Sequence, residues 1–453
     1  MKKETIFLSS LVLITAMINL LNFNNNYHFG GDFAQYIMQS KLSISELKYE
    51  QNYNTYLNSF ISETIGPNLY HSGYPILLKI VSSFDVHQIK YYKLVNIILS
   101  LIFIVICSLI FKNFDKKLMY FGTLLIAFSD EFIIISSSLE ADVSFAIFGI
   151  LIIYTLTNKT LNYKYELSMT YAFISCFFKM QGVLFVGFIL FFYLLNSSKN
   201  KTFLIVFSTL CIISIALYFS EYKVLFGDYS NLQNAFSLKL INLKFNLQVI
   251  ASFFLPKFLD LELYRNMFIF LFVIVYIFNV IKFKIFDFYN LFFTLFLVFF
   301  SSFIFRGGIR FTLFVIPVFI IIVYRALLEI KNVNFQHIVI GLIFLINLVN
   351  LHNFDNFKMY NALYTKESEA LFQWIEKNTN DSDLISFYKP RTLRLITERN
   401  FIHTTFYEDK IFPDFVILLN NQLTVDGENS FNINTQRYKY SENIADFYTV
   451  FYN

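Results

Sequence analysis

The chain carries a succession of apolar runs, each about as long as a helix that crosses a membrane. A helix needs roughly 20 apolar residues to span a hydrocarbon core of about 30 Å. The chain is 56% hydrophobic and only 15% charged, which exceeds the apolar share of a soluble domain. The sequence therefore predicts a polytopic α-helical membrane protein, with runs near 5 to 22, 89 to 111, 118 to 136, 141 to 157, 202 to 220, 264 to 281, 286 to 304, 309 to 327 and 335 to 352.

A further apolar stretch, 165 to 195, is interrupted by the sequence Lys179-Met180-Gln181-Gly182. We interpret it as two short or tilted helices that meet at this break. Together with the nine runs above, these two helices give about eleven predicted transmembrane helices.

Basic residues follow the predicted loops in alternation, and they predict the orientation of the chain. Lys and Arg are enriched in cytoplasmic loops. Lys2 and Lys3 place the N-terminus in the cytoplasm, and treating 165 to 195 as one span would put two later basic clusters outside. The residues 19 to 26 offer no small-residue cleavage site, so the first run is expected to be an uncleaved anchor. The basic groups on the predicted inner side are Lys112, Lys116 and Lys117; Lys159 and Lys164; Lys199 and Lys201; Lys282 and Lys284; Arg325 and Lys331.

This layout predicts a transmembrane domain, 1 to 352, and a C-terminal extracytoplasmic α/β domain, 353 to 453. The first extracytoplasmic loop, 23 to 88, is the largest of the loops. In the tail, ESEALFQWIEKNT and RTLRLITE are typical of helices, whereas DLISFY and PDFVILLNN are typical of strands. The net charge of +4 is small and the lysines cluster at helix ends, so no nucleic-acid partner is expected.

The first outer loop opens with the sequence GGDFAQYIMQSK, which contains Asp32 and Tyr36. Asp32 with Gln35 three residues later fits a capping box at the start of a helix. A carboxylate at a membrane surface can also accept a proton from an acceptor hydroxyl or amine. The two roles are compatible. Near the end of the loop, YHSGYP places His71 and Tyr74 before a returning helix, where His71 is either a solvated loop residue or a ligand.

Other charged residues gather on the same predicted face. Glu140 and Asp142 stand at a helix start, where the helix dipole alone favours acids. Lys179 interrupts an apolar segment, and such a cation is costly without an anionic partner. Arg306 and Arg310 are arginines on the outer side, against the usual bias. With Lys179 they could clamp a phosphate, or they could bind lipid headgroups.

Taken together, these motifs resemble the GT-C glycosyltransferases, in particular bacterial enzymes similar to protein O-mannosyltransferases and the lipid A aminoarabinose transferase. The resemblance rests on the order and sidedness of GGDFAQY, YHSGYP, SLEADVSF, FKMQG, RFTLFVIP and FYKPRTLRLITERN. It implies a GT-C fold in the cell membrane and transfer of a sugar, with inversion, from a polyprenyl-phosphate carrier on the extracytoplasmic face. The partners would be the lipid bilayer, this donor, and a lipid, glycan or protein acceptor.

The resemblance also implies roles for individual residues. Asp32 would be the base or acceptor-orienting carboxylate, and Glu140 a second acid. The carrier phosphate would be bound by Lys179 and Arg310, with Gln181 and Arg306 beside them. Candidate substrate contacts are Tyr36, His71, Tyr74, Asp142, Arg391 and Arg399.

The chain departs from the family pattern at two positions. Many relatives have Asp-Glu where this chain has Asp32-Phe33, and an arginine where it has Lys179. The first difference leaves a metal or second-acid role in that motif unsupported. Because the sequence also shows no convincing metal cluster, no metal and no cofactor is predicted. Two alternatives remain: a polysaccharide polymerase, ligase or lipid-linked glycan flippase, and an inactive membrane scaffold of the same fold.

Overall fold

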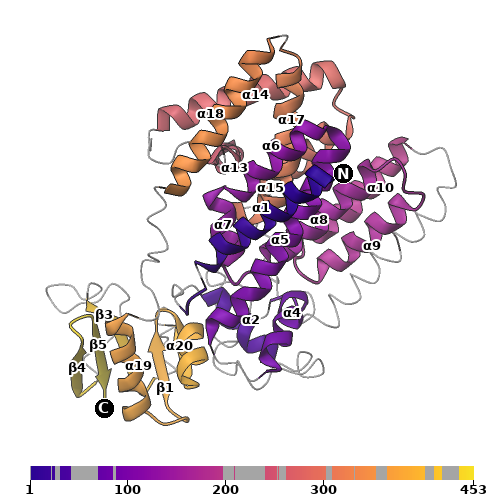
Figure 1. Cartoon of the computed structure of the whole chain (residues 1–453). Coiled ribbons are helices and arrows are strands. Elements are labelled where there is room, and N and C mark those ends of the chain that lie inside the picture. The colour runs from indigo at the N-terminus through magenta and orange to yellow at the C-terminus, as the bar shows by residue number, and fades with distance from the viewer. Residues whose placement is uncertain are drawn as a thin grey trace. The chain divides into compact units, whose positions relative to one another are not determined.

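The computed structural model of the chain (Figure 1) describes residues 2–21, 23–25, 31–41, 70–84, 88–196, 209, 240–252, 254, 262–301, 309–330, 332–352, 365–403, 413–420 and 438–453. Its contacts divide the chain into two compact units. The first, the helical unit, contains Met1–Phe23, Lys93–Glu221 and Ser230–Phe357. The second, the mixed unit, contains Asn24–Tyr92, Tyr222–Tyr229 and Lys358–Asn453, so it joins the described helices of the first predicted loop with the tail.

Long apolar helices make up the helical unit. In the described part of the chain, four of its helices are long and apolar enough to cross a membrane, or five if one bent pair counts as a single span. Shorter apolar helices, α8, α10 and α15 among them, accompany them. The bounds are α1 Lys2–Leu20, α5 Ile89–Phe114, α6 Lys116–Ala127, α7 Asp130–Ser137, α8 Asp142–Thr157, α9 Lys164–Cys176, α10 Gly182–Asn196, α13 Leu240–Ser252, α14 Glu262–Phe283, α15 Phe288–Ser301, α16 Ile309–Thr312, η4 Leu313–Val315, α17 Ile316–Leu328 and α18 Val333–His352.

Several predicted spans correspond to single helices, but two do not. The run 118 to 136 was predicted as one helix, whereas α6 and α7 meet at an angle of 61°. The cause is a new helix start, because Ser129 has extended backbone and two acids, Asp130 and Glu131, follow in the first turn. The run 309 to 327 contains the 3₁₀ turn η4, since Pro317 has no N–H with which to continue the helical bonding. The predicted run 202 to 220 lies outside the described residues, apart from Thr209.

The predicted break in 165 to 195 is confirmed. Helix α9 ends at Cys176 and α10 begins at Gly182. The backbone between them turns back on itself, because the N–H groups of Phe178 and Lys179 both donate to the Ser175 carbonyl at 3.0 Å. The two helices then lie side by side (Figure 1).

Phenylalanine rings fill the space between α8, α10 and η4. The rings of Phe145, Phe185 and Phe314 lie 4.9 to 5.6 Å apart, centroid to centroid. Gly149 in α8 leaves room for the rings of Phe185 and Phe314, since a Cβ at this position would lie 2.8 Å from Phe314 and 3.0 Å from Phe185. This aromatic packing fixes the starts of α8 and α10 relative to the segment that precedes α17.

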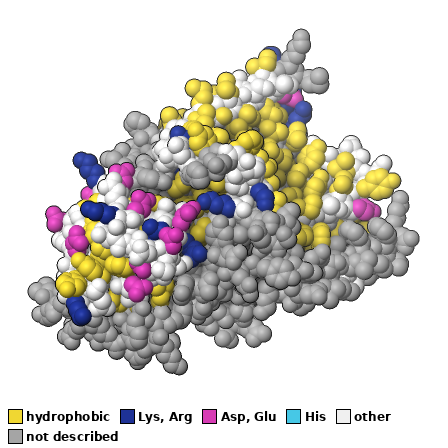
Figure 2. Space-filling view, turned by 90° about the horizontal axis from the view of Figure 1, so that it is seen from below, with side chains coloured by type: hydrophobic (Ala, Val, Ile, Leu, Met, Phe, Trp, Pro, Cys, Tyr) yellow, Lys and Arg dark blue, Asp and Glu magenta, His cyan; other side chains and the backbone are white. Residues whose placement is uncertain are grey.

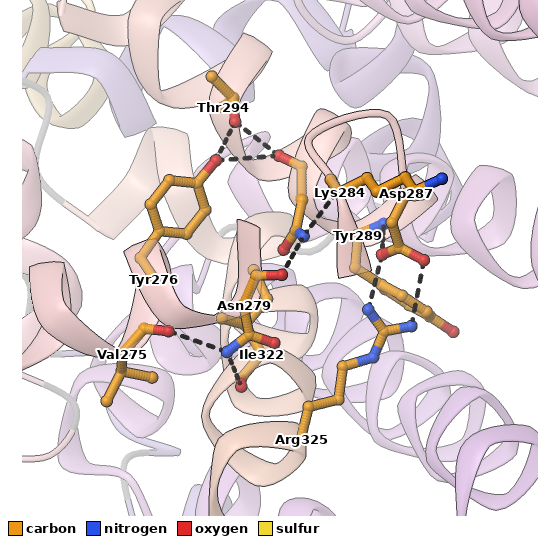
Figure 3. A network of polar contacts seen from close by, with 10 residues as sticks. Val275, Tyr276, Asn279, Lys284, Asp287, Tyr289, Thr294, Ile322 and Arg325 are labelled. Carbon is orange, nitrogen blue, oxygen red and sulfur yellow. Dashed lines mark hydrogen bonds and ion pairs between the residues drawn. The ribbon is translucent and has the colours of Figure 1, made fainter. Parts of the chain in front are cut away.

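A polar network ties α14, α15 and α17 together (Figure 3). The Asn279 amide donates to the carbonyls of Val275 and Ile322, both at 3.0 Å. Arg325 donates to both oxygens of Asp287, at 2.6 and 3.3 Å, and its guanidinium also lies over aromatic rings. Such a bidentate and stacked arginine holds helices in one arrangement. The rings belong to Phe114, Phe283 and Tyr289.

The mixed unit contains a five-stranded sheet with the order β2-β1-β3-β5-β4. Strand β1 is parallel to β2 and β3, and β5 is antiparallel to β3 and β4. The four tail elements predicted from sequence correspond to α19, β1, α20 and β3. The remaining three strands were not predicted. The bounds are α2 Gly31–Lys41, α4 Gly73–Ser82, α19 Lys366–Asn378, β1 Leu384–Phe387, α20 Pro390–Thr397, β2 Asn400–His403, β3 Phe415–Leu419, β4 Tyr440–Ile444 and β5 Tyr448–Tyr452.

The surfaces of the two parts differ in chemistry. In Figure 2, hydrophobic side chains form a broad band over the described helices, whereas Lys, Arg, Asp and Glu gather on the C-terminal domain. Many large apolar side chains on the helices are exposed, including Leu13, Phe270 and Ile281. In an aqueous setting this area would be an aggregation hazard, but it is the surface expected of helices in contact with lipid tails.

Candidate functional site

Two acids stand where α8 begins, and one of them, Glu140, lies in the short connection from α7 to α8. Asp142 is the first residue of α8 and is completely buried, and Glu140 is 8% exposed. Asn96 of α5 holds this connection, because its amide donates to the carbonyls of Ser138 and Glu140. Asn96 is itself buried. The backbone that carries both acids is therefore fixed from a neighbouring helix.

Lys179 lies in the break between α9 and α10, where it forms an ion pair with Asp142. It is 7% exposed, and its Nζ lies 4.3 Å from the centroid of the Phe311 ring. A buried lysine needs such partners, since an unpaired charge away from water is very costly. Asp142 is thus the anionic partner that the sequence analysis expected for Lys179.

Arg310 of α16 approaches both acids. Its Nε lies 2.6 Å from Glu140 Oε2 and 3.2 Å from Asp142 Oδ2. Its side chain is 36% exposed, far more than that of Lys179. The structure therefore brings together four of the predicted residues, and we call Glu140, Asp142, Lys179 and Arg310 the ion cluster. Its two acids balance its two cations, so both cations that were predicted to bind a phosphate are paired with carboxylates in this structure.

Buried polar atoms accompany the ion cluster on the same three segments. Within the described part of the chain, Ser144 Oγ, Gln181 Oε1 and Thr312 Oγ1 have no hydrogen-bond partner. Each follows a charged member of the cluster by two positions. Buried polar atoms in native proteins are normally satisfied, so these three are polar groups available next to the ion cluster.

A second group of predicted residues lies in the mixed unit. Asp32 is in the first turn of α2, which begins at Gly31, so it does not occupy the capping position that the sequence predicted. The Tyr70 hydroxyl donates to Asp32 Oδ1 at 2.6 Å. Arg391 of α20 lies against Tyr70, with Nη1 3.5 Å from the hydroxyl oxygen and the guanidinium 5.7 Å from the ring centroid. We call Asp32, Tyr70 and Arg391 the carboxylate group.

The other candidates surround this group or lie elsewhere. Tyr36 packs on Tyr70 and Tyr74, with centroid distances of 4.6 and 4.9 Å. His71 is 2% exposed, so of its two interpretations, a solvated loop residue or a ligand, the first is wrong. Arg399 binds Thr379 and Asp381 within the C-terminal domain. Arg306 lies outside the described residues.

Two important residues, Tyr70 and Asn96, were missed by the sequence analysis. Tyr70 directly precedes His71 in the motif that was noticed, but only the fold shows that it reaches Asp32. Asn96 is a polar residue in an apolar run, which is the available signal. In the part of the chain that the structure describes, no three His, Cys, Asp or Glu residues are placed to hold a metal ion.

Comparison with known proteins identifies the fold. No protein-family profile matches the sequence, and no curated protein does so either. The crystal structure of ArnT from Cupriavidus metallidurans bound to undecaprenyl phosphate is similar, with a TM-score of 0.62 and 10% identity over 98% of this chain and 97% of that chain. Its apo form has a TM-score of 0.62 and 9% identity, over 99% and 98%.

ArnT is the GT-C lipid A aminoarabinose transferase, and this chain is similar to it in fold, which confirms the resemblance at the level of the fold. The chain is a multi-pass helical membrane protein with a C-terminal mixed β-sheet domain.

Proposed function

We propose that the chain is an integral membrane glycosyltransferase that takes a sugar from a polyprenyl-phosphate carrier. It transfers the sugar, with inversion, to a lipid, glycan or protein acceptor on the extracytoplasmic face of the cell membrane. The observation that carries this proposal is the match to ArnT over nearly the whole of both chains, in a crystal form that holds undecaprenyl phosphate. The charged residues expected for such chemistry support it.

In the proposed reaction, an acceptor hydroxyl or amine attacks the anomeric carbon of the sugar on the face opposite the carrier. A bond forms between this carbon and the acceptor atom, and the bond to the phosphate oxygen breaks. The electron pair of the broken bond stays on the phosphate, and the acceptor proton passes to the Asp32 carboxylate. Cations near the phosphate stabilise the charge that develops on the leaving group.

The two cations of the ion cluster suit this role to different degrees. Lys179 is enclosed by Asp142 and the Phe311 ring, so we assign it to holding the acid in place. Arg310 is partly exposed, and its fork of N–H donors matches a phosphate. We therefore propose Arg310 as the principal contact of the carrier phosphate, with Gln181 beside it and Glu140 and Asp142 setting its orientation.

Binding of the carrier tests this proposal. We expect purified protein in lipid nanodiscs to bind undecaprenyl phosphate, and Arg310→Ala to weaken that binding by roughly tenfold or more, because a charge-assisted contact is lost. Lys282→Ala is the control, since Lys282 is a half-exposed residue that pairs with Glu329. Equal binding by the wild type, Arg310→Ala and Lys282→Ala, or no binding by any of them, would contradict the proposed carrier site.

The alternative functions give a different result with a sugar-loaded carrier. A flippase moves the lipid-linked sugar without breaking the bond between the sugar and the phosphate. We expect this protein to release free polyprenyl phosphate when it is added to membranes that hold both donor and acceptor. Binding without release would favour a flippase, and a product made of repeated sugar units would favour a polymerase.

A further inference from the structure

Asp32 is held in place by residues from two other segments of the mixed unit. The first is Tyr70, which directly precedes the turn into α4 and donates to Asp32 Oδ1 at 2.6 Å. The second is Arg391, which comes from α20, more than three hundred positions further along the chain. Helix α2 packs against both α4 and α20. The carboxylate group is therefore assembled from the first outer loop and the C-terminal domain together.

Tyr70 has little freedom to move. Its backbone carbonyl accepts from the Gln39 side chain at 3.2 Å, and its N–H donates to the same side chain at 3.4 Å. Its ring contacts both the Tyr36 ring and the Arg391 guanidinium. The residue is 9% exposed. A hydroxyl fixed in this way determines the direction of the carboxylate that it binds.

Arg391, a candidate substrate contact in the sequence analysis, is buried in the mixed unit. It is 3% exposed, although it stands in the first turn of a short helix. Removing a guanidinium from water costs free energy. The contacts of Arg391 with the Tyr70 ring and hydroxyl offset part of this cost, and a role in function would explain why the residue is buried here. A cation beside a hydroxyl oxygen polarises the O–H bond, which strengthens the donation of that hydroxyl to a carboxylate.

We propose that Tyr70 and Arg391 are positioning residues for Asp32, with Tyr70 orienting the carboxylate toward the acceptor and Arg391 acting on Tyr70. The C-terminal domain thereby supplies part of the apparatus for proton acceptance. This inference rests on the proposed function, in which Asp32 is the base. It gives the domain a role in the reaction itself, apart from any role in recruiting the acceptor.

The test uses full-length protein added to membranes from cells that lack the gene, which hold the natural donor and acceptor. Release of polyprenyl phosphate gives the rate, and undecaprenyl phosphate binding and thermal melting are measured separately. We expect Tyr70→Phe to keep the ring contacts, the melting temperature and the carrier affinity. Its rate at saturating donor should fall by about 10-fold to 100-fold, because a hydrogen bond to a charged group is lost.

Arg391 is tested by a pair of substitutions with a control on the same helix. Arg391→Met should lower the rate, and Arg391→Lys should recover part of it by restoring the charge. Arg394→Met is the control, since Arg394 binds Asn400 within the C-terminal domain. A purely structural role would instead lower melting and rate together, with no advantage of Lys over Met.

A double substitution separates this inference from the proposed function. In protein that already carries Asp32→Asn, adding Tyr70→Phe should change the residual rate little, since the two residues act as a unit. If Asp32→Asn stops transfer but Tyr70→Phe leaves the rate unchanged, the inference is wrong and the proposed function stands. If Asp32→Asn leaves transfer unchanged, the inference and the assignment of Asp32 as the base are both wrong, whereas the proposed transfer itself stands.

Discussion

Gly182 shows how a single residue determines the geometry of the ion cluster. It is the first residue of α10, and a Cβ at this position would lie 2.6 Å from the backbone nitrogen of Cys176 and even closer to Ser175 Oγ. Only glycine allows the start of α10 to approach the end of α9 so closely. That approach fixes the turn between them, which carries Lys179 and Gln181.

We therefore predict that Gly182→Ala destabilises the protein by about 1 to 3 kcal/mol, the usual cost of overpacking, and displaces Lys179 from Asp142. Gly187→Ala is the matched control in the same helix, because nothing lies within 4 Å of its added methyl group. That variant should melt at or above the wild-type temperature, since alanine favours helix by about 1 kcal/mol over glycine. Thermal melting of the two purified variants decides the matter, and equal melting would contradict the packing argument.

At the level of elements, the sequence predicted what depends on local pattern and missed what depends on distant contacts. The break at Lys179 was found because a charge and a glycine interrupt an apolar run. The α6–α7 bend was missed because apolar residues resume directly after Ser129-Asp130-Glu131, although Ser-Asp-Glu is a helix-start signal. The grouping of Asp142 with Arg310 and of Asp32 with Arg391 could not be predicted, because the partners lie more than a hundred residues apart and only the fold brings them together.

Asn96 links α5 to the connection that carries Glu140, so its substitution should lower the stability of the protein. We predict that Asn96→Ala destabilises the protein by about 1 to 3 kcal/mol, because two buried carbonyls lose their donor. It should also reduce transfer, since the backbone of Glu140 is released. Asn347→Ala is the control: this equally buried amide donates only to Ile343, a carbonyl of its own helix. Similar melting of the two variants would show that Asn96 does not hold the connection.

At the level of the whole molecule, ion pairs place the first predicted cytoplasmic segments at one end of the helical unit. Glu4 near the N-terminus pairs with Nζ of Lys112, in the last turn of α5, at 2.8 Å and with Nζ of Lys116, the first residue of α6, at 2.6 Å. This agrees with the alternation of basic loops on which the orientation rests. Which side of the membrane this end faces is a prediction from the basic residues alone.

Reporter fusions test that orientation. We predict that a reporter fused after Lys201 is active only in the cytoplasm and that one fused after Asn356 is active only outside it. The reason is that the basic clusters retain their loops on the inner side. An alkaline phosphatase and a fluorescent protein, each fused at both positions, provide reciprocal readouts. A C-terminal domain found in the cytoplasm would put the carboxylate group on the wrong side for the proposed reaction.

The most direct test of the account is the substitution Asp32→Asn, because it removes a proton acceptor but keeps the size of the side chain and an oxygen that can accept from Tyr70. If Asp32 is the base, the purified variant should melt like the wild type and bind undecaprenyl phosphate equally well. Its transfer rate should be lower by roughly 10²-fold to 10⁴-fold. A variant with normal transfer would contradict the account, leave Asp32 as a structural residue at the start of α2, and make Glu140 the next carboxylate to test.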